Sequence, residues 1–236
     1  MELFYIPKVL HNEAVLEGEE LHHVTRVLRK RQGETIHFTD GMGARFSGVI
    51  GPVTGKEARI TITAREQVED AACRVTVATA LTKNMKRMEW AFEKMTELGV
   101  HQVIPLICKR SERASMPRAR VEKILTAAMK QSERLWRPQL SDLVAFEEVV
   151  PTADAGVKYL AHRSDGSVAL ARHYTPGSDV LILIGPEGDF SHDEVRMAVD
   201  SGCLPVHFGE NRLRTETAAV YAVAAINTLN SRANDT

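Results

Sequence analysis

The sequence predicts an α/β protein in two parts: a small strand-rich domain over 1–70 and a larger domain, 73–236, with a mostly parallel sheet. Short strand patterns separated by turn residues fill most of 34–64, which is typical of a small barrel. After residue 73, strand patterns alternate with helix patterns, and this alternation favours a parallel sheet covered by helices on both faces. The polar segment 65–72 between the two patterns predicts a linker.

The composition is that of an ordinary globular protein. The chain has 236 residues, 44% of them hydrophobic and 26% charged, and its formal net charge is −1. This balance excludes a polycation, so any nucleic-acid partner must be bound by a local basic patch. The longest apolar run, 180–184, is far shorter than the roughly 20 residues that span a bilayer. The first eight residues do not resemble a signal peptide, and we expect a cytoplasmic protein with no membrane partner.

The three cysteines, Cys73, Cys108 and Cys203, are widely spaced, and no Cys-x-x-Cys pair occurs. They therefore predict neither a disulfide framework nor a zinc site. We expect reduced, mostly buried thiols and no bound metal.

Alternation and turn residues predict the elements of the N-terminal part. β-branched and aromatic residues at 34–39 precede an Asp-Gly turn, and further strands are expected at 44–51 and 57–64. One helix interrupts this pattern at 19–30, where apolar residues recur at helical spacing.

In the C-terminal part, strand and helix patterns follow one another. The strands are predicted at 74–81, 103–107, 157–161, 180–184 and 204–208. The helices are predicted at 84–98, at 117–136, from 191 onward, and at 215–229. Gly99 fits the residue that ends a helix, and Ser191 with Glu194 fits a capping box. The last helix is apolar on most faces, which indicates burial in the core or in a subunit interface.

A glycine-rich loop, Gly185-Pro186-Glu187-Gly188, follows the apolar strand 180–184. Ligands of parallel sheets bind beyond the carboxyl ends of the strands, and glycine lets the backbone approach a ligand closely. By itself the loop is also compatible with a plain structural turn. The signatures of P-loops, dinucleotide-binding loops, zinc proteases and serine-hydrolase elbows are absent from the sequence, which weakens the usual hydrolase and dehydrogenase assignments.

A second cluster, 208–218, also lies between a strand and a helix. Capping of the helix explains Thr215 and Glu216, whereas Arg212 and Arg214 gain nothing from the positive end of a helix dipole. An anionic ligand or a partner carboxylate is therefore expected opposite the two arginines.

Basic residues gather in four runs despite the balanced total charge, at 26–31, 83–87, 109–120 and 130–137. A solvated face explains any single run, whereas four runs together favour a surface that follows RNA phosphates. Few aromatic residues lie among them, which favours recognition of a folded RNA by its shape over stacking of single-stranded bases.

Five segments, taken in order along the chain, resemble the bacterial 16S ribosomal RNA uridine-N3 methyltransferases of the SPOUT class (RsmE-like). The segments are 21–29 (LHHVTRVLR) with Gly33, 86–89 (KRME) with 94–100 (KMTELGV), 131–134 (QSER), 184–188 (IGPEG) and 213–218 (LRTETA). Because they are spread over nearly the whole chain, the resemblance is specific.

The resemblance implies an N-terminal PUA-like RNA-binding barrel and a C-terminal SPOUT domain with a trefoil knot, in a homodimer. It also implies S-adenosylmethionine as the cofactor, held by the loops of the knot. The implied cofactor-binding residues are His162, Ile184, Gly185, Pro186, Glu187, Gly188, Phe208, Gly209, Arg212, Leu213, Arg214 and Thr217. The sequence departs from the family pattern at Asp189, where a second glycine is usual, and at 211–213, where Arg-Ile-Leu is common.

The implied reaction is methylation of N3 of a specific uridine in 16S ribosomal RNA, on the assembled small subunit. Because N3 must lose a proton, Arg214 is expected to stabilise the uracil anion, and Glu216 or a phosphate-linked path to accept the proton. The residues expected to contact RNA are Arg26, Arg29, Lys30, Arg31, Lys83, Lys86, Arg87, Arg110, Arg113 and Arg134. Two alternatives stay open: another SPOUT enzyme that acts on a ribose 2′-hydroxyl or on transfer RNA, and a non-catalytic RNA-binding assembly factor.

Overall fold

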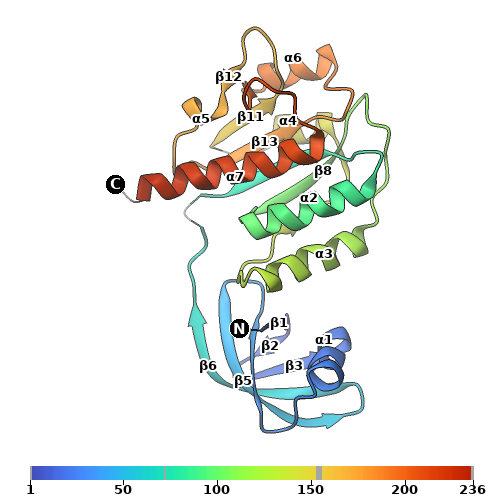
Figure 1. Ribbon diagram of the computed structural model, residues 1–236, viewed down its shortest axis with the longest axis vertical. Helices are drawn as coiled ribbons and strands as arrows, with labels where there is room; N and C mark the ends of the chain where they lie inside the picture. Colours follow the sequence, from blue (N-terminus) through green and yellow to red (C-terminus); the bar gives the residue numbers. More distant parts are fainter. Residues whose placement is uncertain (1, 72, 153–155, 235–236) are drawn as a thin grey trace. The chain divides into compact units, whose positions relative to one another are not determined.

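The computed structural model describes residues 2–71, 73–152 and 156–234. They form two compact units, which Figure 1 shows in sequence colours. One unit comprises Met1–Asp70 and Thr126–Arg137, and the other comprises Ala71–Leu125 and Pro138–Thr236.

The strands of the N-terminal unit form a six-stranded sheet in the order β1-β4-β5-β6-β3-β2. They are β1 (Leu3–Tyr5), β2 (Val9–Leu10), β3 (Glu13–Glu17), β4 (Thr35–Thr39), β5 (Ala44–Thr54) and β6 (Glu57–Gln67). Neighbouring strands are antiparallel except β1 and β4, which run parallel. Buried and half-buried residues alternate along most of β5, so one face of the strand packs on a core that contains Phe38, Phe46 and Ile60. The predicted strands are confirmed.

Strand β6 extends beyond its predicted end. It continues to Gln67 and pairs there with Ala44 of β5, so the first three residues of the predicted linker 65–72 belong to the sheet. The prediction of a linker at 65–67 was wrong, because an exposed strand end carries polar side chains just as a linker does. Residue 72 lies outside the described residues.

The helix predicted at 19–30 is shorter in the structure. α1 (Gly18–His22) is followed directly by a single π-helical turn, η1 (His23–Val27). The N–H of Leu28 donates to a carbonyl five residues earlier at 3.0 Å. Arg29 then adopts φ 57°, a left-handed conformation that ends the helix. Apolar spacing alone does not reveal this change of backbone.

The C-terminal unit contains a parallel sheet in the order β10-β8-β7-β13-β11-β14-β12, with β9 paired to β8. Its strands are β7 (Val75–Ala80), β8 (Gln102–Ile107), β9 (Gln139–Leu140), β10 (Val144–Ala145), β11 (Val157–Ala161), β12 (Val168–Ala169), β13 (Val180–Ile184) and β14 (Leu204–His207). The predicted parallel sheet is confirmed. The short strands β9, β10 and β12 lack a sequence signal, because two residues show no periodicity.

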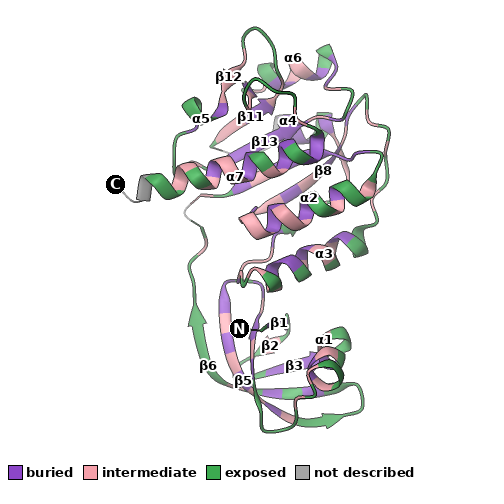
Figure 2. Ribbon diagram, in the orientation of Figure 1, coloured by how far each residue is buried: buried purple, intermediate pink, exposed green. Residues whose placement is uncertain are grey.

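Helices cover both faces of this sheet. α2 (Met85–Leu98) and α7 (Thr215–Asn234) lie side by side, and α7 also packs on β7 and β13 (Figure 1). α4 (Phe146–Thr152) and α6 (His192–Asp200) pack together on the opposite face. Every residue of β13 is therefore buried (Figure 2).

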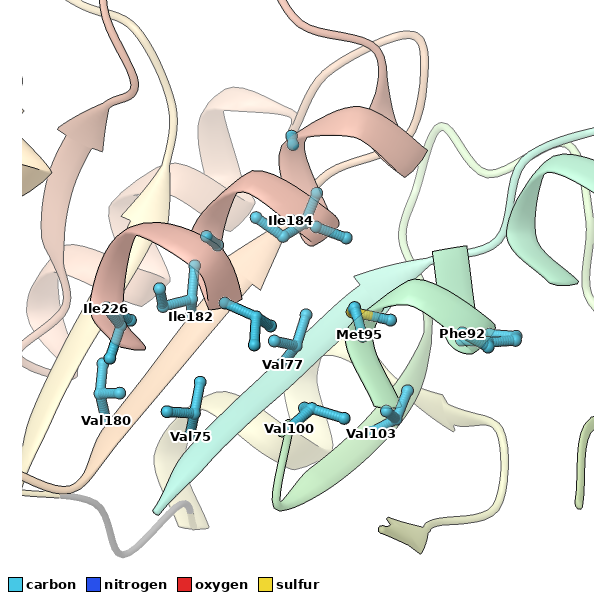
Figure 3. Packing of buried hydrophobic residues seen from close by; sticks show 14 of the residues in the cluster. Val75, Val77, Phe92, Met95, Val100, Val103, Val180, Ile182, Ile184 and Ile226 are labelled. Atoms are coloured by element: carbon cyan, nitrogen blue, oxygen red, sulfur yellow. The ribbon is translucent and has the colours of Figure 1, made fainter. Parts of the chain in front are cut away.

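The side chains of β13 alternate between two cores. Val180, Ile182 and Ile184 pack with residues of α2 and α7, as Figure 3 shows, whereas Leu181 and Leu183 pack with residues of α4 and α6. Full burial of each such side chain contributes roughly 1.5–3 kcal/mol. This double burial explains why the strand is a continuous apolar run.

Three predicted helix ends are confirmed by their caps. The side chain of Asn84 accepts a hydrogen bond at the start of α2, and Gly99 ends this helix with φ 90°. At α6, Ser191 and Glu194 form the reciprocal capping box.

Two other helices differ from their predicted lengths. α3 (Arg118–Gln131) ends five residues before the predicted residue 136, because Glu133 adopts a left-handed φ of 54°. α7 continues to Asn234, beyond the predicted residue 229, because nothing in its polar last turns breaks a helix. α4 and the short α5 (Leu170–His173) were not predicted.

Candidate functional site

A cavity of about 640 Å³ lies at the carboxyl ends of neighbouring strands in the C-terminal unit. The loops after β11, β13 and β14 supply most of its lining, together with the first turn of α7. Because these strands are adjacent in the sheet, in the order β13-β11-β14, their carboxyl ends meet at one edge.

The loop after β13 forms a tight turn. The N–H of Asp189 donates to the carbonyl of Pro186 at 2.9 Å and closes the turn. Gly185 lies against the ring of Phe190, where a Cβ on residue 185 would be only 3.0 Å from a ring carbon. Any side chain at 185 would therefore force the buried ring of Phe190 to shift.

Two hydrogen bonds join this loop to the segment that precedes α7. The hydroxyl of Thr215 donates to the carbonyl of Gly185 at 2.9 Å. Nη2 of Arg212 donates to the carbonyl of Glu187 at 3.1 Å. The glycine-rich loop and the arginine cluster, which the sequence shows as two separate motifs, therefore belong to one site.

A buried carboxylate and a cation face this cavity. Glu216 lies in the first turn of α7, and its side chain is only 10% exposed. Its Oε1 lies 3.8 Å from Nη1 of Arg87 in α2. The cation and the positive end of the helix dipole both offset the cost of burying the negative charge. A partner carboxylate opposite Arg212 and Arg214 is not confirmed among the described residues. Glu216 pairs with Arg87, and Arg212 donates to the backbone carbonyl of Glu187.

His162 follows β11 and contacts the loop after β13. Its Nδ1 lies 3.2 Å from both carboxylate oxygens of Asp189. Asp189 adopts φ 63°, a backbone conformation that aspartate tolerates better than most residues. Residue 189 therefore has a left-handed backbone, the conformation that glycine adopts most readily.

The cavity brings together most of the residues predicted to bind a cofactor. They are His162, Ile184, Gly185, Pro186, Glu187, Phe208, Gly209, Arg212, Leu213 and Arg214. The two residues expected to be catalytic, Arg214 and Glu216, both line it. Gly188 and Thr217 are outside this lining: a Cβ on Gly188 would lie 3.4 Å from Cβ of Arg110, and Thr217 is exposed.

Sequence reasoning did not single out Arg163, Val206 or His207, which also line the cavity. Each lies at or just beyond a strand end, and Ala161 of β11 pairs in register with Val206 of β14. The signal that identifies them is the adjacency of β11 and β14, which a single sequence does not give.

Half of the residues predicted to contact RNA belong to the N-terminal unit. Arg26, Arg29 and Arg31 are exposed there. Lys30 is half-buried and donates to a backbone carbonyl at 3.2 Å. Arg134 belongs to the same unit, and burial lowers the pKa of its guanidinium.

The other half belong to the C-terminal unit and are partly engaged within it. Lys86 and Arg87 are exposed on the first turn of α2. Lys83 forms an ion pair with a nearby glutamate at 3.2 Å, and Arg113 donates to the carbonyl of Lys83 at 3.4 Å. Arg110 donates to two backbone carbonyls of the loop after β13.

The described residues, 2–71, 73–152 and 156–234, contain neither of two other kinds of site. None of the helices there is long and apolar enough to cross a membrane. In the same part of the chain, no group of three or more histidine, cysteine or acidic side chains is placed to hold a metal ion.

Comparison with known proteins shows the protein family to which this chain belongs. Residues 69–227 match the model of an RNA methyltransferase domain, and residues 16–63 match that of an RNA methyltransferase PUA domain. Because the first match covers more than half of the sequence, the chain belongs to the RNA methyltransferase family, with an N-terminal PUA-like domain.

Similar proteins narrow the group. The chain is 30% identical over 226 residues to ribosomal RNA small subunit methyltransferase E of Bacillus subtilis. The aligned region covers 89% of this chain and 88% of that protein. A probable rRNA-methyltransferase from Porphyromonas gingivalis has a similar structure, with 37% identity, a TM-score of 0.92 and coverage of 99% and 100% of the two chains. Ribosomal RNA small subunit methyltransferase E from Neisseria gonorrhoeae, solved bound to S-adenosyl methionine, has 26% identity, a TM-score of 0.85 and coverage of 97% and 98%.

Proposed function

We propose that this protein methylates N3 of a uridine in 16S ribosomal RNA, with S-adenosylmethionine as the methyl donor and the assembled small ribosomal subunit as the substrate. One observation carries the proposal. In a chain of the RNA methyltransferase family, a single cavity joins the glycine-rich loop 185–188 to Arg214 and Glu216. The relative from Neisseria gonorrhoeae, of the same fold, binds S-adenosyl methionine.

The cavity fits the chemistry of this cofactor. Its volume of about 640 Å³ lies within the range of small-molecule sites, about 300–1,000 Å³. Ile184, Phe208 and Leu213 give it apolar surface suited to a flat base. The carboxylates of Glu187 and Asp189 can balance the cationic groups of the cofactor.

S-adenosylmethionine supplies a methyl group on a cationic sulfur, which makes that methyl an electrophile. The task of this chain's residues is to present uracil N3 without its proton. Arg214 stabilises the negative charge that spreads onto the uracil carbonyl oxygens, because a guanidinium stays cationic and donates two hydrogen bonds.

Glu216 accepts the N3 proton on a carboxylate oxygen, which frees the nitrogen lone pair to form the new N–C bond as the carbon–sulfur bond breaks. Its position at the cavity wall suits this role, because a general base must lie within reach of the proton that it removes. Arg87, 3.8 Å away, offsets the carboxylate's charge before the transfer.

The resemblance stated from the sequence supports the remaining parts of the proposal. The PUA-like domain within 1–70 and the exposed basic residues of both units bind the RNA. The domain over 73–236 contains a trefoil knot at the cofactor loops and pairs with a second copy in a homodimer. The substrate, a ribosomal subunit, places the reaction in the cytoplasm.

The test is a methyl-transfer assay with purified protein, methyl-labelled S-adenosylmethionine and small subunits from a strain that lacks its gene. We expect label in 16S ribosomal RNA of these subunits, and no label in subunits from the parent strain, which are already methylated. Label on a ribose hydroxyl of this RNA, or label in transfer RNA when it is offered in place of the subunits, would contradict the proposed substrate. Cofactor binding without transfer to any RNA would contradict the proposed reaction.

A further inference from the structure

A basic segment, 108–113, follows β8 and reaches the loop after β13. Nη1 of Arg110 donates to the carbonyl of Gly188 at 2.9 Å and to the carbonyl of Phe190 at 3.2 Å. The stem of Arg110 packs at the same place, because a Cβ on Gly188 would lie 3.4 Å from Cβ of Arg110. One arginine therefore holds two backbone groups of the loop that also supplies Gly185 to the cavity.

The segment that carries Arg110 is itself fixed in place. The N–H of Lys109 donates to a carboxylate oxygen of Glu194 at 2.7 Å, and the other oxygen accepts from the N–H of Ser191 at 2.7 Å. Glu194 is buried at 2% exposure, so this link is shielded from water. The hydroxyl of Ser111 accepts from the N–H of Cys108 at 2.9 Å and closes the segment on itself. Arg110 thus extends from a rigid base.

The carbonyls that Arg110 binds lie on either side of Asp189. Phe190 is the residue whose ring packs against Gly185, and it also packs on Phe146 at a centroid distance of 5.3 Å. Holding the backbone of Phe190 therefore also holds the ring that limits the position of Gly185. A displacement of this loop would change the shape of the cavity wall.

We propose that Arg110 is a positioning residue for the cofactor loop 185–190. Its place in a basic run predicted a ligand of RNA phosphate, and this proposal replaces that role. This inference rests on the proposed function, because it takes the cavity to be the S-adenosylmethionine site. Both carbonyls accept from the same nitrogen, Nη1, at the end of a side chain one bond longer than that of lysine, so a lysine ammonium at 110 would not reach the same position.

The test compares Arg110→Ala and Arg110→Lys with the wild type and with Arg172→Ala. Arg172 is an exposed arginine of α5 in the same unit and lies outside the cavity lining, so it is a matched control. For each protein, calorimetry gives the Kd for S-adenosylmethionine, filter binding gives the affinity for 16S ribosomal RNA at several salt concentrations, and thermal unfolding confirms the fold.

We expect both Arg110 variants to bind S-adenosylmethionine at least tenfold more weakly than the wild type, with RNA affinity and its salt dependence unchanged. Arg172→Ala should match the wild type in both assays. Arg110→Lys is decisive if Arg110→Ala is poorly folded, because it keeps the charge and most of the stem.

Two results would overturn the inference. One is a Kd for S-adenosylmethionine within twofold of the wild type in both variants. The other is unchanged cofactor binding together with a weaker salt dependence of RNA binding in Arg110→Ala, which would make Arg110 a phosphate ligand. Failure of the wild type to bind S-adenosylmethionine is a distinct outcome, because it would refute the proposed function itself.

Discussion

The carboxylate of Asp189 lies 3.2 Å from Nδ1 of His162 and joins two loops of the cavity. Its Oδ1 also accepts a hydrogen bond from the N–H of Phe190 at 2.8 Å. The residue at which the sequence departs from the family pattern therefore makes specific contacts with the loop after β11 and with its own loop. These contacts stabilise the left-handed backbone of residue 189, which glycine adopts without them.

Substitutions at 189 should separate two contributions to the free energy of unfolding: the left-handed backbone conformation and the contacts of the side chain. Asp189→Gly and Asp189→Ala lose the same contacts, but alanine is strained at φ 63°. We expect Asp189→Gly to be the more stable of the two by about 1 kcal/mol, as measured by urea unfolding. Asp189→Asn keeps an oxygen for the N–H of Phe190 and should lie closest to the wild type. An alanine variant as stable as the glycine variant would contradict this account.

Arg214 should affect turnover far more than cofactor binding. Loss of a donor that stabilises negative charge in a transition state typically lowers kcat by about 100–1,000-fold, and we expect a loss of this size for Arg214→Ala. The Kd for S-adenosylmethionine should change far less than kcat, because Arg214 lines the cofactor cavity but its proposed partner in the reaction is the uracil. Steady-state kinetics and calorimetry measure the two quantities. Near-normal turnover in this variant would refute the assignment.

The exposed arginines of the N-terminal unit should contribute to RNA affinity through charge. Replacing Arg26 and Arg29 together by alanine should weaken RNA binding and reduce the magnitude of the slope of log K against log salt by about 1.4–1.8. Lys56→Ala, at an exposed hairpin of the same unit, should change neither. Affinity for S-adenosylmethionine should be unaffected. A double variant with the wild-type slope would exclude phosphate contacts at these two positions.

Two thiols should resist alkylation in the folded protein. Burial raises the pKa of Cys108 to about 12 and that of Cys203 to about 11. Because the thiolate is the reactive form, both should be labelled by iodoacetamide at pH 8 much more slowly in the folded than in the unfolded chain. Cys73 is only half-buried and should be labelled faster than either. Peptide mass spectrometry after timed labelling measures all three; rapid labelling of Cys108 would contradict its burial.

Elements with strong local signals could be predicted from the sequence. β11 (Val157–Ala161) and β13 (Val180–Ile184) have their predicted bounds, because apolar runs of this length between turn residues indicate buried strands. The ends of α2 and the start of α6 were also predictable, because capping residues act within a few positions of the chain.

Relationships between distant segments could not be predicted in this way. The contact of His162 with Asp189 joins residues 27 positions apart, and the bond from Arg110 to Gly188 joins residues 78 positions apart. Both depend on the strand order, which places β13 between β7 and β11. The two loop motifs of the site were visible as separate segments, whereas the bond from Thr215 to Gly185 that unites them required the fold.

The identity of the methylated nucleoside tests the central claim most directly. Small-subunit RNA from a strain lacking the gene would be digested to nucleosides and analysed by mass spectrometry, before and after incubation of its small subunits with the purified protein and S-adenosylmethionine. The account predicts that N3-methyluridine is missing before incubation and restored by the wild type, but not by Arg214→Ala. Undiminished N3-methyluridine in the deletion strain, or the appearance of a different methylated nucleoside, would contradict it.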